Sequence, residues 1–207
     1  MEVNLLYSTP LYIAIMAIRR CYDSMDKSDS NIFDLGEKDQ DLLRKIIKDG
    51  HTSTLEHIVF TFEINGISRA CLQELARHRM ASLSVQSTRY TLNKFLKNGT
   101  PAKDLLVLTG DVSVDSLNQA SLETLLRHYD SFPNDVLKYP LPEAYKTSLI
   151  WSINARSLRN FLQLRSSTRA LWEMQKLAGK VKKAIGEEYQ ILFEDIEPHY
   201  EKEESYN

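Results

Sequence analysis

The sequence predicts one α+β domain over residues 1–207, in which several helices pack a small antiparallel or mixed sheet. Two periodicities support this fold class. Apolar residues at spacings of three and four mark helices, and a strict alternation from Ile58 to Ile64 marks a strand. A length of 207 residues fits one domain, and no repeat or linker divides the chain. We expect residues 198–207 to form a frayed polar tail.

The first part of the chain is predicted to hold two helices, the alternating strand and a third helix. Thr9-Pro10 favours a helix start, and the apolar face that follows is Leu11, Ile15, Ile18 and Tyr22. A second helix is expected over 39–48. The strand is expected to end at Gly66, and a helix over 68–79 follows it.

The second part of the chain is predicted to be mainly helical, with one more strand. We expect an irregular segment at 80–90 and a polar loop at 98–112. The regular elements expected after these are a helix near 115–129, a short strand at 147–153, and helices at 155–165 and 168–185.

Composition excludes several classes of protein. No run approaches the roughly 18 apolar residues of a membrane helix, and the N-terminus lacks the basic region of a signal peptide. Cys21 and Cys71 form no CxxC pair, so we expect a cytoplasmic protein without a disulfide framework. The seven glycines form neither a GxGxxG nor a GxxxxGK loop, so any nucleotide must be held by side chains.

Two segments are strongly basic, although the whole chain has a net charge of −2. Residues 66–100 hold six basic residues and one acid, and residues 144–172 hold five basic residues and no acid. Arginine dominates both, and its planar fork suits phosphate or carbonyl groups. This pattern indicates local anion sites rather than a general nucleic-acid surface. Solvated helix faces paired with distant acids are the alternative.

The helix expected over 68–79 places Arg79 back on its apolar stripe, seven residues after Leu72. An arginine there is costly unless an anion meets it, although a frayed helix end would let it reach solvent instead. Arg77 points away from Arg79, so the two are expected to contact different groups.

The segment from His51 to His57 does not have the ligand spacing of a zinc site, so no metal is expected. Ser53 and Glu56 instead fit a capping box, whose free amides could receive a phosphate; plain helix capping is the alternative.

Polar residues also follow the second expected strand. Asn154 is placed to cap the next helix, on which Arg156 and Asn160 share a face. Arg165 lies about 180° from Arg156, so this helix offers polar groups on two sides.

Three separate motifs together resemble the flavin-dependent thymidylate synthases. RHRMASLSVQSTRY, which begins at Arg77, matches the RHR-x7-S pattern of that family and places its serine at Ser87. HTSTLEHIVFTFEI, from His51, and SINARSLRNFLQLR, which ends at Arg165, resemble two further family motifs. The resemblance covers roughly residues 5–195 in the expected order.

The resemblance implies a homotetramer whose active sites form between subunits. It implies that dUMP becomes dTMP, with methylenetetrahydrofolate as the carbon donor and NADPH as the reductant through bound FAD.

The resemblance also implies site residues. Those expected to contact FAD are Ser53, Arg77, His78, Arg79, Asn154, Arg156 and Asn160. Those expected to hold dUMP are Glu74, Arg77, Gln86, Ser87, Arg89, Lys138 and Arg165, with Ser87 and Arg89 near the phosphate. Arg165 is also the expected catalytic residue, because a fixed cation stabilises charge that develops on the uracil ring. His51 and Tyr90 match positions near the flavin and the folate.

The chain departs from the family pattern at two places. Ser84 and Val85 stand where many members have Asn and Glu, which removes a side-chain contact, and Lys138 stands where arginine is common. Neither cysteine matches a motif and no base is evident beside Ser87, so we favour activation of the uracil without an enzyme nucleophile.

Two other functions use the same residues. A single-strand-binding module would need exposed aromatic residues among the arginines, and a non-catalytic flavin carrier would have no use for Arg89 and Arg165.

Overall fold

The computed structural model describes residues 1–196, apart from the side chains of Asn93, Leu96 and Asp130. The tail expected at 198–207 therefore lies outside the described residues. The expectation of one domain over 1–207 stays a prediction.

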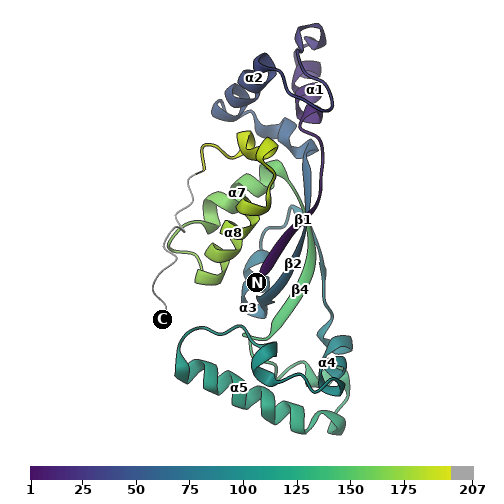
Figure 1. Ribbon diagram of the computed structural model, residues 1–207, viewed down its shortest axis with the longest axis vertical. Helices are drawn as coiled ribbons and strands as arrows, with labels where there is room; N and C mark the ends of the chain where they lie inside the picture. Colours follow the sequence, from purple (N-terminus) through teal and green to yellow (C-terminus); the bar gives the residue numbers. More distant parts are fainter. Residues whose placement is uncertain (197–207) are drawn as a thin grey trace.

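A four-stranded antiparallel sheet runs through the middle of the elongated molecule (Figure 1). Its order is β1-β2-β4-β3, and its strands are β1 (Glu2–Ser8), β2 (Val59–Ser68), β4 (Lys146–Asn154) and β3 (Ala81–Val85). β2 continues past Gly66, where a positive φ of 73° accompanies a shift of register between Asn65 and Ile67. The expected sheet is thus antiparallel, not mixed.

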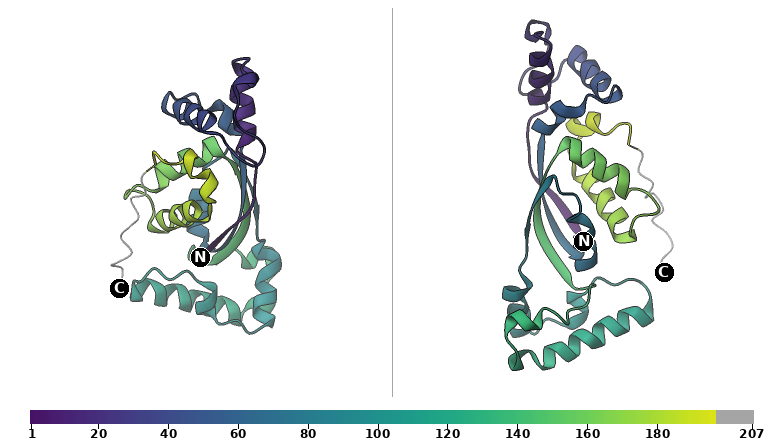
Figure 2. Two further views of the ribbon diagram at one scale, coloured as in Figure 1. Left: turned by 45° about the horizontal axis from the view of Figure 1, so that its top comes forward. Right: turned by 180° about the vertical axis from the view of Figure 1, so that it is seen from behind.

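One face of the sheet is covered by α7 (Ala155–Arg165) and α8 (Trp172–Ala184), which Figure 2 shows from two further sides. The alternation of β2 turns Phe60, Phe62 and Ile64 toward these helices, and all three are fully buried. Trp151 of β4 meets Phe161 of α7 edge to face, with ring centroids 5.0 Å apart. This layer forms the main hydrophobic core.

The two ends of the sheet carry different helical groups (Figure 1). One end has α1 (Tyr12–Cys21), the 3-10 helix η1 (Met25–Lys27), α2 (Glu37–Lys48) and the 3-10 helix η2 (Thr52–His57), with η5 (Glu187–Leu192) against α2. The other end has α4 (Thr88–Lys97), η3 (Ala102–Leu105), α5 (Val112–Arg127), η4 (Tyr129–Ser131) and α6 (Asn134–Leu137). A second hydrophobic cluster, built around Leu105, Leu122 and Tyr145, fills this second end.

Several predicted elements are confirmed, including the first two helices, the alternating strand and the helix over 155–165. The last predicted helix is α8, which starts at Trp172 instead of Thr168. The helix expected near 115–129 begins at Val112, where Asp111 caps it by accepting hydrogen bonds from Ser113 N and Val114 N.

One strand was missed and three expectations were wrong. β1 was not predicted, although Val3 and Leu5 point inward and Glu2 and Asn4 outward. The segment 80–90 is not irregular, because it forms β3 and begins α4. The polar loop at 98–112 contains η3, whose Leu105 is buried. Finally, α3 (Arg69–Leu75) ends at Leu75 rather than reaching Arg79.

Candidate functional site

A pocket of about 460 Å³ lies at the end of the sheet that carries α4 and α6. The residues that line it are Arg69, Leu72, Gln73, Val85, Gln86, Ser87, Thr88, Arg89, Asp135, Lys138 and Thr147. Four of the residues expected to hold dUMP are therefore brought together here: Gln86, Ser87, Arg89 and Lys138.

Local hydrogen bonding explains why the chain presents these residues. Gln86 N donates to Ser148 O at 2.8 Å, which continues the pairing of β3 with β4 for one more residue. Ser87 O then accepts from Tyr90 N and Thr91 N as α4 begins. The junction from β3 to α4 thus turns at the pocket wall and leaves Ser87 exposed.

The pocket has more positive than negative groups. Its cations are Arg69, Arg89 and Lys138, and its one acid among the lining residues is Asp135. Asp135 is already engaged, because Arg89 Nη1 donates to its Oδ1 at 3.1 Å. Arg89 Nη2 donates to Tyr90 Oη at 2.8 Å. The pocket is therefore an environment that favours an anion.

A second group of predicted residues is built around Arg165 at the end of α7. Its Nε donates to His78 Nε2 at 2.9 Å, and its Nη1 donates to Glu74 Oε2 at 3.0 Å. Arg77 forms an ion pair with the same Glu74 carboxylate at 3.3 Å. Glu74, Arg77, His78 and Arg165 therefore form one cluster, which we call the Arg165 cluster.

The electrostatics of the Arg165 cluster keep His78 neutral. Burial lowers the pKa of His78, and the nearby charges of Arg165 and Arg77 lower it further, against a smaller opposing effect of Glu74. The ring lies edge-on to Phe161, with centroids 5.1 Å apart. Because Nε2 accepts from Arg165, the ring proton belongs on Nδ1.

Arg79 does not lie where the sequence analysis placed it. Because α3 ends at Leu75, Arg79 is not on the apolar stripe of that helix, and its side chain is exposed. The expectation of a core-facing Arg79 was therefore wrong, and the alternative, that it reaches solvent, describes its position.

A third group lies where η2 meets the start of α7, and we call it the η2–α7 group. Asn154 caps α7 as expected, since its Oδ1 accepts from Ser157 N at 2.8 Å. Arg156 Nη1 donates to Glu56 Oε1 at 2.6 Å. Ser53 is exposed on η2, and Asn160 is exposed one turn beyond Arg156.

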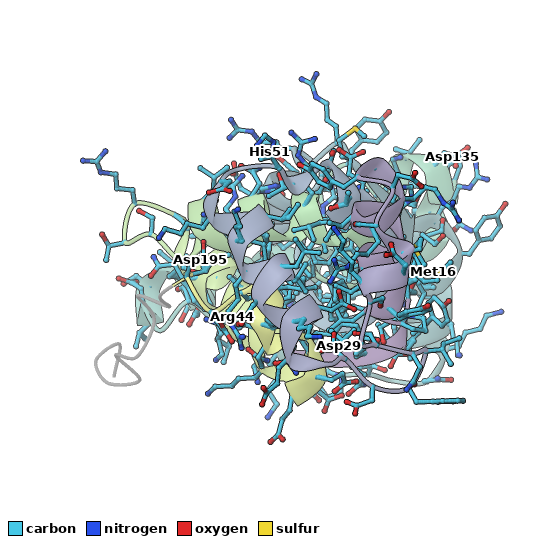
Figure 3. The ribbon with its side chains drawn as sticks, turned by 90° about the horizontal axis from the view of Figure 1, so that it is seen from above. Met16, Asp29, Arg44, His51, Asp135 and Asp195 are labelled. Atoms are coloured by element: carbon cyan, nitrogen blue, oxygen red, sulfur yellow. The ribbon has the colours of Figure 1, made fainter. Side chains whose placement is uncertain are left out.

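The expected capping box at Ser53 and Glu56 was wrong. Residues 52–57 form a 3-10 helix whose N-cap is His51 and which has no side-chain cap. Glu56 turns to Arg156 instead of to the backbone. His51 lies at the end of the molecule that holds α1 and α2, which Figure 3 views along the long axis.

The structure separates the η2–α7 group from the pocket. Thr147 of the pocket and Asn154 of the η2–α7 group lie on the same strand, β4, seven residues apart. At about 3.3 Å per residue, they are roughly 23 Å apart. The pocket and the η2–α7 group are thus two separate places within one chain.

Sequence reasoning gave no binding role to the other seven lining residues: Arg69, Leu72, Gln73, Val85, Thr88, Asp135 and Thr147. Arg69 was counted in the basic segment but received no role, and Asp135 belongs to a helix, α6, that was not predicted. Among residues 1–196, no three His, Cys, Asp or Glu side chains are grouped as metal ligands. Within that part of the chain, no helix is long and apolar enough to cross a membrane.

Comparisons with known proteins agree on one family. The family model described as thymidylate synthase complementing protein matches residues 4–189. A flavin-dependent thymidylate synthase of Wolinella succinogenes is 50% identical over 202 residues, which cover 93% of this chain and 97% of that one. Its counterpart in Campylobacter jejuni is 47% identical over 204 residues, covering 94% of this chain and 96% of that protein.

A solved structure is also similar over nearly the whole chain. It is a crystal structure of thymidylate synthase X from Helicobacter pylori with FAD and dUMP, 44% identical, with a TM-score of 0.86. The match covers 95% of this chain and 98% of that one.

Proposed function

The chain belongs to the family of flavin-dependent thymidylate synthases, and we propose that it converts dUMP to dTMP. In this reaction 5,10-methylenetetrahydrofolate donates the carbon, and NADPH is the reductant through bound FAD. The proposal extends to this chain the FAD and dUMP that the similar Helicobacter pylori structure contains.

The observation that carries the proposal is the pocket beside β3 and α4. Four of the seven residues expected to hold dUMP line it: Gln86, Ser87, Arg89 and Lys138. Arg89 and Lys138 supply positive charge for a phosphate, and the Ser87 hydroxyl supplies a further donor. The Gln86 amide can both donate and accept, as the alternating carbonyl and N–H groups of uracil require.

The residues expected to hold FAD suit its chemistry. Arg77, Arg79 and Arg156 are exposed and can donate hydrogen bonds to the oxygens of a diphosphate, and Ser53 and Asn160 add exposed polar groups. Their chemistry therefore fits the cofactor. Bound FAD would supply two-electron redox chemistry, which the side chains of this protein cannot provide.

Arg165 is proposed to stabilise negative charge on the uracil ring. Its three hydrogen bonds, one to His78 and two to Glu74, fix the guanidinium before substrate arrives, which lowers the cost of reorganisation during the reaction. Because His78 is neutral, it orients Arg165 without adding a second positive charge. Glu74 and Arg77 are expected to reach the nucleotide from this side.

Ser87 is proposed to bind the nucleotide and not to attack it. The residues that line the pocket around it include no histidine, and the carboxylate among them, Asp135, is paired with Arg89. A serine hydroxyl without an adjacent base is a weak nucleophile. Activation of the base by Arg165 is therefore the mechanism we favour.

The separation of the residue groups supports a site shared between subunits. The η2–α7 group and the pocket lie roughly 23 Å apart along β4. A second chain would bring one group next to the other. This is the arrangement we propose for a homotetramer whose subunits each contribute to several sites.

Anaerobic absorption spectroscopy tests the proposal. The protein is reconstituted with FAD, NADPH is added without oxygen in the presence and absence of dUMP, and dTMP is then measured after methylenetetrahydrofolate is supplied. We expect the flavin bands to bleach, dUMP to change the spectrum or the rate, and dTMP to form. Failure to bind FAD would overturn the proposal, and bleaching without any dTMP would favour a non-catalytic flavin carrier.

A further inference from the structure

Arg69 is a lining residue of the pocket to which no role has been assigned. It occupies the first position of α3 and is half-buried. Its Nε is completely buried and has no hydrogen-bond partner within residues 1–196. Burying such a donor without a partner is unfavourable, so the observation calls for an acceptor.

Other buried arginines of the chain show what Arg69 lacks. Arg19 donates to Asp39 at 2.8 Å through Nε, and Arg159 donates to Asp195 at 2.7 Å through Nη1. In both cases a carboxylate of the same chain receives the guanidinium. Arg69 forms no ion pair with a described residue, and the acid of its pocket, Asp135, is bound to Arg89.

The backbone beneath Arg69 is fixed. Arg69 N donates to Tyr145 O at 3.1 Å. The preceding residue, Ser68, is held by Glu173, which accepts from both its N and its Oγ and is 3% exposed. Both carboxylate oxygens of Glu173 are thereby engaged with Ser68. The Arg69 side chain therefore starts from a rigid position at the pocket wall.

The charge balance of the pocket points to the missing acceptor. Three cations, Arg69, Arg89 and Lys138, face a single carboxylate among the lining residues, which leaves two positive charges in excess. A phosphate monoester carries about −1.5 to −2 charges at pH 7 and offers three acceptor oxygens. Its negative charge matches the two excess positive charges of the pocket, and its oxygens can accept a hydrogen bond from the unpartnered Nε of Arg69.

We propose that Arg69 binds the phosphate group of the nucleotide in this pocket, as a third cation beside Arg89 and Lys138. The inference rests on the proposed function, because it takes dUMP as the ligand. It adds to that function a residue that the motif resemblance does not include. Arg69 acts in binding, so the effect of replacing it falls on KM and Kd for dUMP and leaves kcat unchanged.

Binding of dUMP and of deoxyuridine, which lacks the phosphate, tests the inference on the FAD-loaded protein. The variants are Arg69→Met, Arg69→Gln and Arg69→Lys, with Arg20→Met, an exposed arginine of α1, as the matched control. We expect Arg69→Met and Arg69→Gln to weaken dUMP binding about 10- to 100-fold, as loss of a charge-assisted hydrogen bond does. Arg69→Lys restores part of the affinity, because it keeps the charge without the fork.

Three comparisons distinguish phosphate binding from a structural role. Deoxyuridine affinity stays unchanged in all variants, KM for NADPH stays unchanged, and Arg20→Met behaves as the unaltered protein. Equal loss of dUMP and deoxyuridine affinity would overturn the inference, as would unchanged dUMP binding in Arg69→Met or Arg69→Gln. A selective rise in KM for NADPH would assign Arg69 to the phosphates of that reductant and also overturn it.

Arg69→Met and Arg69→Gln differ in shape, so one of them can fold where the other does not. If Arg69→Met does not fold, Arg69→Gln tests whether Arg69 binds the phosphate. If neither variant folds, Arg69→Lys provides the test. An Arg69→Lys protein with unaltered preference for dUMP over deoxyuridine would then count against the guanidinium. If the unaltered protein binds no dUMP, the proposed function fails and the inference fails with it. If dUMP binds and Arg69 makes no difference, the inference alone fails.

Discussion

The guanidinium of Arg165 is held from two sides, by His78 at 2.9 Å and by Glu74 at 3.0 Å. A cation fixed in this way contributes most where charge develops during the reaction, rather than in the bound substrate. Arg165→Met is therefore expected to lower kcat about 10²- to 10³-fold while changing dUMP affinity much less. Single-turnover rates and dUMP titrations of the variant measure the two effects.

The exposed Arg127 of α5 provides a control for general loss of positive charge, since Arg127→Met should leave both quantities unchanged. An Arg165→Met protein with normal kcat and weak dUMP binding would show that Arg165 holds the substrate and does not activate it.

Ser87 gives a second prediction at this scale. No residue that lines the pocket is a free base for the hydroxyl, so Ser87→Ala is expected to keep measurable turnover. We expect it to raise KM for dUMP by about tenfold, the value of one hydrogen bond to a charged group. Steady-state kinetics with the FAD-loaded variant measure this. Complete loss of turnover with intact dUMP binding would instead indicate a covalent role for the serine.

His78 predicts how stability changes with pH. Its pKa in the folded protein is lowered, by burial first and then by Arg165 and Arg77, below the ordinary value of about 6.5. Between these two pKa values the unfolded chain binds the proton and the folded protein does not. Stability therefore rises with pH through this window and is lost as the pH falls through it.

Thermal unfolding of the protein and of His78→Gln from pH 5 to pH 7 tests this expectation. The variant keeps a side chain that can accept from Arg165 but does not titrate, so the difference in midpoint between the two proteins should change most below pH 6.5. Parallel pH profiles for the two proteins would mean that His78 does not contribute.

At the scale of elements, α1 and α2 are joined by a buried ion pair. Arg19 of α1 is 8% exposed and Asp39 of α2 is fully buried, and their side chains meet at 2.5 Å. Ser28 Oγ also donates to Asp39, at 2.6 Å. Asp39→Asn leaves the Arg19 charge buried without its counterion, so we expect a loss of about 3 kcal/mol in the free energy of unfolding.

Urea unfolding of Asp39→Asn against Asp41→Asn measures that loss on the same helix. Asp41 is paired only across the surface and is 81% exposed, so its replacement should cost less than about 1 kcal/mol. Equal stabilities of the two variants would refute a structural role for the buried pair.

Element boundaries show what local sequence can predict. The alternation in β2 and the apolar spacing in α7 are strong, because both elements lie against the main core. β3 is an edge strand of five residues in which Ala81, Leu83 and Val85 alternate with two serines, and its pairing with β4 depends on a segment about 70 residues away. A helix over 68–79 was expected from the same local reasoning, but the turn after Leu75 brings His78 to Arg165, 87 residues away.

The same distinction applies to the candidate site. The motifs named Gln86, Ser87, Arg89 and Lys138, and the structure brings them into one pocket. They did not name Arg69, because sequence alone does not tell which arginine finds a carboxylate and which does not. The burial and the hydrogen-bond partners of each guanidinium depend on tertiary contacts between segments that are far apart in the sequence.

The proposed assembly gives the prediction at the scale of the whole molecule. We expect a homotetramer, and four chains of 23.9 kDa would have a mass of about 96 kDa, which light scattering measures directly. The stronger test concerns the site, since the pocket and the η2–α7 group are roughly 23 Å apart in one chain. If a working site takes the pocket from one subunit and the η2–α7 group from another, two inactive variants should complement each other.

Arg89→Ala damages the pocket, and Arg156→Ala damages the η2–α7 group. Mixed after reversible dissociation, the two proteins should recover about a quarter of the unaltered activity, because random pairing gives that share of sites with both parts intact. A mixture of Arg89→Ala with Lys138→Ala is the matched control. Both changes lie in the pocket, so no subunit has an intact one and no activity returns. If the tetramers exchange subunits but the mixture of Arg89→Ala and Arg156→Ala regains no activity, each complete site lies within one chain.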